Sequence, residues 1–126
     1  MSEIDSKNPI VLVVEDDEDT RYLLRLGLEA RGYRVCEAED GEQAIALACR
    51  ERPDAILMDI SMPVLNGLTA TARIRQHIEL RKLPIIAVTA HHEVDLRDGA
   101  QASGFTAYVT KPIDFDWLDE LIKGLL

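Results

Sequence analysis

Two short apolar runs in this chain each end in carboxylate side chains. Residues 10–14 read Ile-Val-Leu-Val-Val and are followed by acidic residues at 15–17, and residues 55–58 read Ala-Ile-Leu-Met and are followed by Asp59. Near-continuous apolar runs of this length are typical of parallel β-strands that are covered on both faces. Ligands of open α/β sheets bind beyond the carboxyl ends of such strands. The pattern therefore predicts that several negative charges meet at one edge of a parallel sheet.

Such a group of negative charges is costly unless a cation lies among them, because neighbouring carboxylates oppose one another's ionisation. Hard divalent cations prefer oxygen ligands. A Mg²⁺-dependent carboxylate site at these strand ends is therefore the first hypothesis.

The rest of the chain alternates strands with helices, and its 126 residues fit one domain. Strict alternation with short connections predicts a parallel sheet with helices on both faces and right-handed crossovers. We expect residues 1–8 to form a flexible polar tail and residues 9–126 to form the folded domain. We expect strands at 10–14, 33–38, 55–59, 85–89 and 106–110, and helices at 17–31, after Asp40, at 66–77, at 93–103 and after Asp114.

The composition argues against several classes of function. The formal net charge is −9, and so acidic a surface repels phosphate backbones, which argues against direct binding of nucleic acid. No apolar stretch is long enough to span a bilayer, and the first residues lack the apolar core of a signal peptide. We therefore expect no membrane association and a cytoplasmic location. Cys36 and Cys49 are expected to be free, buried thiols, which suits a reducing compartment.

Four of the five expected strands end in polar or reactive residues. These are Glu15 with Asp16, Asp59, Thr89 and Lys111. Any one of them alone is most often a solvated loop residue, a helix cap or a surface lysine. Carboxylates, a hydroxyl and an ammonium group at the same end of one parallel sheet instead predict a site there.

These residues lie in motifs that resemble the receiver domain of two-component response regulators. The matching pieces run in the family's order from residue 10 to residue 126. They are Val-Val-Glu-Asp-Asp at 13–17, Leu-Met-Asp-Ile-Ser-Met-Pro at 57–63 with Asn-Gly at 66–67, Val-Thr-Ala at 88–90 and Tyr-Val-Thr-Lys-Pro at 108–112. One such motif is weak evidence, whereas four together are specific. The resemblance implies a doubly wound (βα)5 flavodoxin-like three-layer sandwich with strand order 2-1-3-4-5.

The resemblance also implies a role for each matching residue. Asp59 corresponds to the phosphoacceptor. Asp16 and Asp59 correspond to direct Mg²⁺ ligands, Glu15 to an acid that reaches the metal through water, and Ser61 to the position whose backbone carbonyl binds it. Lys111 corresponds to the lysine that pairs with the acceptor and then with the phosphoryl oxygens. The peptide bond between Lys111 and Pro112 corresponds to one that is usually cis. Thr89 corresponds to the hydroxyl that bonds the phosphoryl group, and Tyr108 with Thr89 to the switch.

The implied function is acceptance of a phosphoryl group from a sensor histidine kinase or a histidine phosphotransfer protein, with signalling to a downstream protein that the sequence does not identify. The domain would act on its own Asp59 and would not be an enzyme in the usual sense. The alternative is a receiver-like interaction module without phosphotransfer. A dehalogenase-type phosphotransferase would need a second Asp at position 61, where this chain has Ser61. A flavodoxin-like FMN carrier would need a hydroxyl-rich phosphate loop where this chain has acidic residues 15–17.

Overall fold

The computed structural model describes residues 8–60, 66–89 and 104–126. Ser61, the expected helix at 93–103 and all but the last residue of the expected tail lie outside the described residues.

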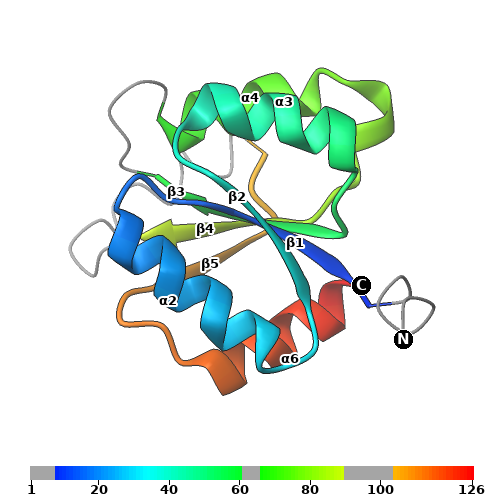
Figure 1. Cartoon of the computed structure of the whole chain (residues 1–126). Helices are drawn as coiled ribbons and strands as arrows, with labels where there is room; N and C mark the ends of the chain where they lie inside the picture. The colour runs from blue at the N-terminus through cyan, green and yellow to red at the C-terminus, as the bar shows by residue number, and fades with distance from the viewer. Residues whose placement is uncertain (1–7, 61–65, 90–103) are drawn as a thin grey trace.

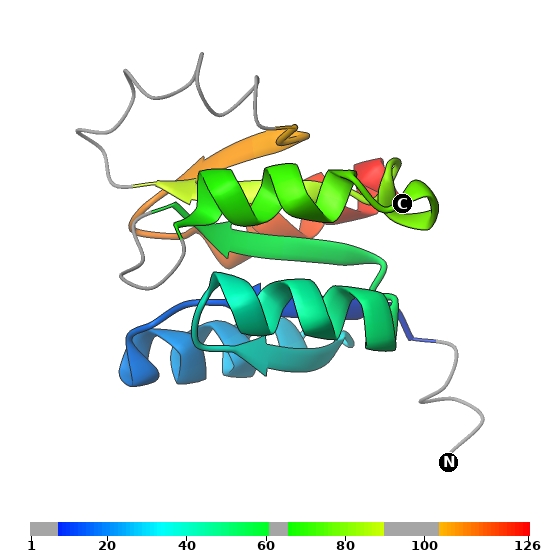
Figure 2. The same cartoon turned by 90° about the horizontal axis from the view of Figure 1, so that it is seen from above.

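Five parallel strands form one sheet in the order β2-β1-β3-β4-β5, which confirms the expected fold class. The strands are β1 (Ile10–Val14), β2 (Arg34–Ala38), β3 (Ala55–Asp59), β4 (Ile85–Thr89) and β5 (Ala107–Thr110). Because all pairings are parallel, the carboxyl ends of the strands lie at one edge of the sheet, and the strand arrows in Figure 2 point to the same side. Asp59 and Thr89 are the last residues of their strands, as expected.

Four α-helices and one short 3₁₀ helix are present in the described part of the chain. They are α2 (Glu18–Glu29), α3 (Gly41–Glu51), α4 (Gly67–Arg75), η1 (Ile78–Leu80) and α6 (Phe115–Leu125). Each α-helix begins after an Asp or Asn whose side chain accepts a hydrogen bond from a backbone N–H of the first turn, which is the usual N-cap arrangement. The sequence predicted Asp40 and Asp114 as caps, and it missed η1, whose residues were assigned to no element.

The sheet separates two apolar layers. One contains Leu12, Ile56 and Met58 and is covered by α3 and α4, and the other contains Val11, Leu57 and Val88 and is covered by α2 and α6. Alternate residues of each inner strand therefore face opposite layers, and this is why β1, β3 and β4 carry apolar residues almost without interruption. Figure 1 shows the three-layer arrangement.

Two further expectations can be compared with the structure. Cys36 and Cys49 are free, as predicted, but both are only partly buried, because they lie at the border of the layer that includes α3. Among the described residues, no helix combines the length and the apolar character needed to cross a membrane.

Candidate functional site

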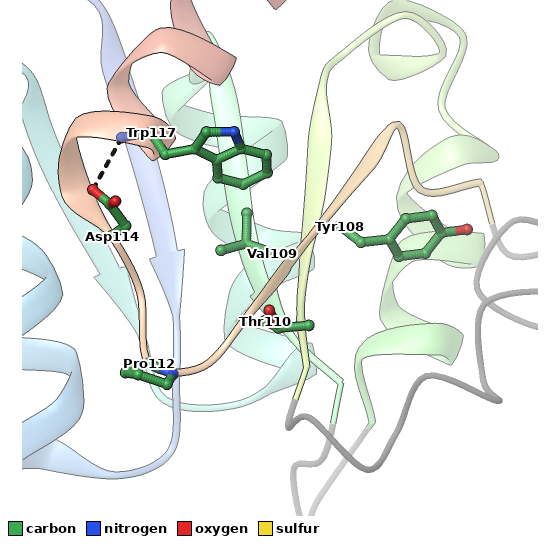
Figure 3. A pocket seen from close by; sticks show the side chains of 6 residues that line it. All are labelled: Tyr108, Val109, Thr110, Pro112, Asp114 and Trp117. Carbon is green, nitrogen blue, oxygen red and sulfur yellow. Dashed lines mark hydrogen bonds between the residues drawn. The ribbon is translucent and has the colours of Figure 1, made fainter.

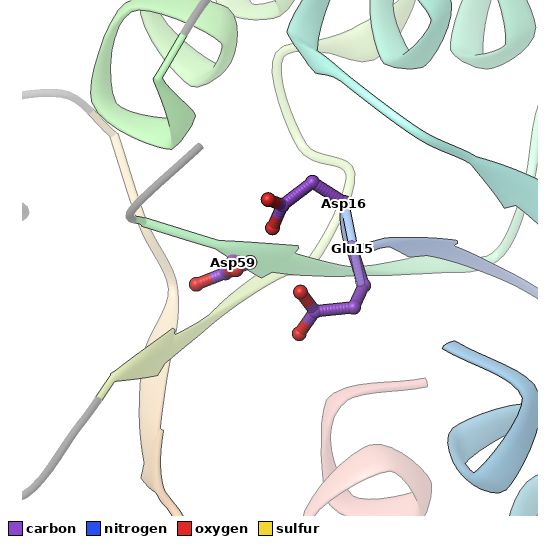
Figure 4. A group of neighbouring side chains, drawn as sticks. All are labelled: Glu15, Asp16 and Asp59. Atoms are coloured by element: carbon purple, nitrogen blue, oxygen red, sulfur yellow. The ribbon is translucent and has the colours of Figure 1, made fainter. Parts of the chain in front are cut away.

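Three carboxylates meet at the carboxyl edge of the sheet. Glu15, Asp16 and Asp59 each offer an oxygen, and these oxygens all lie within 4.8 Å of one another (Figure 4). Glu15 and Asp16 follow the last residue of β1, and Asp59 is the last residue of the neighbouring strand β3. The parallel pairing of β1 with β3 therefore brings together acids that lie more than forty positions apart in the sequence.

Glu15 is held from several directions although it lies outside a regular element. Its side chain is almost fully buried; Oε2 accepts a hydrogen bond from the Asp17 N–H at 3.2 Å, and Oε1 lies 3.4 Å from Lys111 Nζ. Its backbone carbonyl accepts a hydrogen bond from Arg21 Nη1 at 2.9 Å, and the Arg21 guanidinium also pairs with Glu37. Sequence reasoning did not identify Arg21, because nothing in its spacing distinguishes it from the other basic residues of the same helix.

The two aspartates differ in accessibility. Asp59 is 5% exposed and Asp16 is exposed. The register of β3 places Asp59 opposite Val88 of β4, so its backbone is fixed between two buried strands. A buried carboxylate on a fixed backbone therefore lies beside an exposed one.

Asp17 supports the site without belonging to the carboxylate group. It caps α2, because its Oδ2 accepts a hydrogen bond from the Thr20 N–H at 2.9 Å. The hydrogen bond from the Thr20 hydroxyl, with that from the Thr20 backbone, holds the pKa of the Asp17 carboxyl below its usual value. Asp17 therefore stays ionised as a cap and confirms its expected role at the start of a helix.

Thr89 and Lys111 complete the same edge of the sheet. Thr89 is 5% exposed at the end of β4, and its carbonyl accepts a hydrogen bond from the Lys111 N–H at 2.8 Å. The peptide bond between Lys111 and Pro112 is cis, as the resemblance implied. The ammonium group of Lys111, which follows β5 directly, contacts the Glu15 carboxylate at 3.4 Å. Its pairing with Asp59, and the ligand role of Ser61, stay predictions.

An apolar surface adjoins Lys111. A pocket of about 260 Å³ lies between α2 and the start of α6, and its lining consists of Thr20, Leu23, Leu24, Lys111, Pro112, Ile113 and Phe115. Tyr22, Leu23 and Leu26 of α2 are 52%, 62% and 42% exposed. Residues spaced three and four apart share one side of a helix, so this apolar stripe continues from the pocket along α2.

A second pocket lies beside the outer strand β5. It measures about 320 Å³ and is lined by Tyr108, Val109, Thr110, Pro112, Asp114 and Trp117 (Figure 3). Tyr108 and Val109 leave β5 towards opposite faces of the sheet, as Figure 3 shows. Trp117, the only tryptophan of the chain, is 48% exposed at the start of α6. Trp117 therefore packs against the folded domain only in part.

The chain is similar to several known proteins over most of its length. Residues 11–123 match the family model described as response regulator receiver domain. The chain is 37% identical over 116 residues to protein PilH of Pseudomonas aeruginosa, which covers 92% of this chain and 96% of PilH. It is 40% identical over 116 residues to the polar-differentiation response regulator DivK of Brucella anthropi, which covers 92% of this chain and 94% of DivK.

The fold is similar to that of a solved receiver domain that contains a metal ion. The receiver domain of the sensor histidine kinase PA1611 from Pseudomonas aeruginosa has a TM-score of 0.87 and 36% sequence identity, with 94% of this chain and 97% of that chain covered. That structure has a magnesium ion coordinated in its active site cleft.

Proposed function

Because this chain belongs to the family of response regulator receiver domains, we propose that Asp59 accepts a phosphoryl group from a phosphohistidine of a sensor histidine kinase or a histidine phosphotransfer protein. The observation that carries this proposal is the convergence of the Glu15, Asp16 and Asp59 oxygens beside the ammonium group of Lys111. If the domain were an interaction module without phosphotransfer, nothing would explain why the buried Asp59 carboxylate lies beside those of Glu15 and Asp16.

The donor set fits Mg²⁺. All three groups offer carboxylate oxygen, the ligand that this ion prefers, and Mg²⁺ keeps several waters when proteins bind it. The three oxygens lie close enough together, within 4.8 Å of one another, for one ion to contact the group. Following the family resemblance, we propose that Asp16 and Asp59 bind the ion directly and Glu15 through water, with the Ser61 carbonyl as a further ligand. When bound, Mg²⁺ would neutralise negative charge on the equatorial phosphoryl oxygens.

The residues of the chain have distinct tasks in the transfer. A carboxylate oxygen of Asp59 forms a bond to phosphorus while the bond from phosphorus to the donor nitrogen breaks, and the electron pair stays on the imidazole. Lys111 places its positive charge beside the transferred group, and the Thr89 hydroxyl donates a hydrogen bond to it. Phosphoryl transfer depends on such positioning and charge neutralisation more than on covalent help from the protein.

The phosphodonor would dock on the apolar stripe of α2. Tyr22, Leu23 and Leu26 are large exposed side chains, and Leu23 also lines the pocket that contains Lys111. The surface is therefore continuous with the site that must receive the phosphoryl group. An amphipathic helix of the donor that carried the phosphohistidine could cover this stripe and bring the imidazole to Asp59.

The signal would leave through the pocket beside β5. In the proposal, the Thr89 hydroxyl moves towards the phosphoryl group and Tyr108 turns into the space that it leaves. Tyr108 lines the pocket with Pro112 and Trp117, so a change in its position alters the surface that a downstream protein contacts.

The test is phosphorylation of the purified protein by acetyl phosphate with and without Mg²⁺. We expect an acyl phosphate that is labile to acid and to alkali in the wild-type protein with Mg²⁺, and none after chelation or in Asp59→Asn. Glu120→Gln, which removes an exposed acid of α6, is the control and should behave as the wild type does. Absence of phosphate from the wild-type protein would favour the interaction module instead.

A further inference from the structure

Gly67, the first residue of α4, lies against the backbone of Asp59. A Cβ atom built on Gly67 would be 2.3 Å from the Asp59 carbonyl oxygen, 3.0 Å from Ile60 Cα and 3.0 Å from Met58 Cγ. Separations below 3.0 Å essentially never occur for real Cβ atoms. Two of these three neighbours are backbone atoms of buried residues, so they cannot move aside as the end of a flexible side chain can.

The backbone conformation of Gly67 does not by itself require glycine. Among the described residues, the glycines with positive φ are Gly32 and Gly104. What requires glycine at position 67 is the close approach of the helix start to the end of β3.

Several hydrogen bonds hold this approach in place. The Gly67 N–H donates to the Ile60 carbonyl at 3.0 Å, and the Ile60 N–H donates to the Val88 carbonyl of β4 at 3.3 Å. The Asn66 side chain caps the helix by accepting a hydrogen bond from the Thr69 N–H at 2.9 Å. The start of α4 is therefore tied to the end of β3, because it cannot move away without breaking the hydrogen bond from Gly67 to Ile60.

We infer that Gly67 is a positioning residue for the phosphoacceptor. The inference rests on the proposed function of Asp59. The α4 start supports the Asp59 peptide from one side, while the Glu15 and Asp16 carboxylates approach its side chain from another. A methyl group at position 67 would force the helix start and the Asp59 peptide apart by about 1 Å, and a misplacement of about that size can slow a reaction on the order of 100-fold.

The experiment compares three Gly→Ala variants. Gly67→Ala adds a methyl group beside Asp59. Gly104→Ala adds one at a positive φ of 102°, 2.9 Å from Arg75 Cγ, and lies before β5 at the opposite edge of the sheet. Gly124→Ala adds one in α6 where nothing lies within 4 Å. The first two should both lower the melting temperature, and the third should not.

The first readout is the rate of acyl phosphate formation from acetyl phosphate at saturating Mg²⁺, measured on folded protein well below each melting temperature. We expect Gly67→Ala to be at least 10-fold slower than the wild type, and Gly104→Ala and Gly124→Ala to stay within 2-fold of it. Equal rates for Gly67→Ala and Gly104→Ala would overturn the inference, because the loss would then follow stability and not position.

The second readout does not require phosphorylation. It is the ¹³C chemical shift of the Asp59 carboxyl, and we expect it to change in Gly67→Ala and to stay as in the wild type in Gly104→Ala. If the wild-type protein takes up no phosphate, the proposed function fails, and the chemical shift alone decides whether Gly67 positions Asp59; an unchanged shift rejects the inference. If Gly67→Ala does not fold, Asn66→Ala takes its place, because it loosens the same helix start without adding a methyl group at position 67. A wild-type chemical shift of the Asp59 carboxyl in Asn66→Ala would also reject the inference.

Discussion

At the scale of single residues, Lys111 holds the positive charge that balances a buried acid. Its Nζ lies 3.4 Å from Glu15 Oε1, and the Glu15 side chain is only 3% exposed. Burial of an unpaired carboxylate is unfavourable, and hydrogen bonds to charged groups are among the stronger ones in proteins. The same ammonium group borders the space in which the phosphoryl group would lie. Lys111 therefore affects the folded protein and the proposed reaction through the same charge.

We predict that Lys111→Ala slows phosphorylation by acetyl phosphate on the order of 100-fold, the loss typical of removing one preorganised group that stabilises developing charge. Mg²⁺ binding should persist or become tighter, because the variant removes a positive charge from the neighbourhood of the carboxylates. Calorimetric titration with Mg²⁺ and a phosphorylation time course separate the two effects. An unchanged rate of phosphorylation would contradict the assigned role of Lys111.

Tyr33 and Asp119 form a contact that makes stability depend on pH. The Tyr33 hydroxyl donates a hydrogen bond of 2.6 Å to Asp119 Oδ1, which joins the chain before β2 to α6. This hydrogen bond holds the pKa of the Asp119 carboxyl below its usual value, and burial, with the same bond, raises the pKa of Tyr33. An aspartate whose pKa is lower in the folded state adds stability above its unfolded pKa of about 3.9, and this stability is lost as the pH falls through the folded pKa.

We therefore predict that Tyr33→Phe lowers the free energy of unfolding by about 1 to 2 kcal/mol at pH 7. The difference in free energy of unfolding between wild type and variant should shrink as the pH is lowered from about 4 to about 3. Protonation of Asp119 weakens its hydrogen bond with Tyr33, which only the wild type can form. Urea unfolding at a series of pH values measures both quantities. A difference that stayed constant over the acid range would show that Asp119 is not the relevant partner.

At the scale of elements, α4 contains a polar side chain that the structure buries without a described partner. Thr71 is 0% exposed, and its Oγ1 has no hydrogen-bond partner within the described part of the chain. Buried hydroxyl groups without partners destabilise proteins, whereas a methyl group at the same place fills the same space.

We predict that Thr71→Val raises the free energy of unfolding by about 1 kcal/mol, and the melting temperature by about 4 °C. Thr69→Val on the same helix, where the side chain is half-buried, is the matched control and should change the melting temperature much less. Thermal unfolding followed by circular dichroism gives both values. Destabilisation by Thr71→Val would mean that the hydroxyl has a partner outside the described residues.

The helices and strands that local sequence patterns determine could be predicted from the sequence. The apolar runs gave β1, β3 and β4 because those strands are covered on both faces, and Asp40 and Asp114 marked helix starts because their side chains cap them. The turn η1 was not predictable in this way. It is stabilised by Arg75, whose guanidinium donates to the Leu80 and Arg81 carbonyls and to Gly104, contacts between segments that no local pattern reveals.

The same distinction holds for the site. Glu15, Asp16, Asp59 and Lys111 could be proposed because parallel strands bring their carboxyl ends to one edge, a rule that needs only the order of elements. The close approach of Gly67 to Asp59 could not be derived, because it depends on a distance of tenths of an ångström between two elements. Motif matching singled out position 67, and the structure supplies its physical reason.

At the scale of the whole molecule, the proposed signal passes through strands β3, β4 and β5. Asp59 pairs with Val88 in the sheet, and Thr89, the next residue, accepts a backbone hydrogen bond from Lys111 at the end of β5. Tyr108 lies on β5 and lines the same pocket as Trp117. The phosphoacceptor and the outer pocket are thus connected by neighbouring strands of one sheet.

Trp117 is the only tryptophan of the chain, so its fluorescence reports on this pocket alone. We predict that beryllofluoride with Mg²⁺, which mimics the acyl phosphate, changes the emission of Trp117 in the wild type and not in Asp59→Asn. Tyr108→Ala should reduce that change while beryllofluoride still binds, because Tyr108 is the residue expected to carry the movement into the pocket. Binding is measured separately by ¹⁹F NMR of the bound fluoride. If the fluoride signal shows full occupancy while the emission of Trp117 stays constant, the phosphoacceptor and the β5 pocket are not coupled, and the downstream protein must read a different surface.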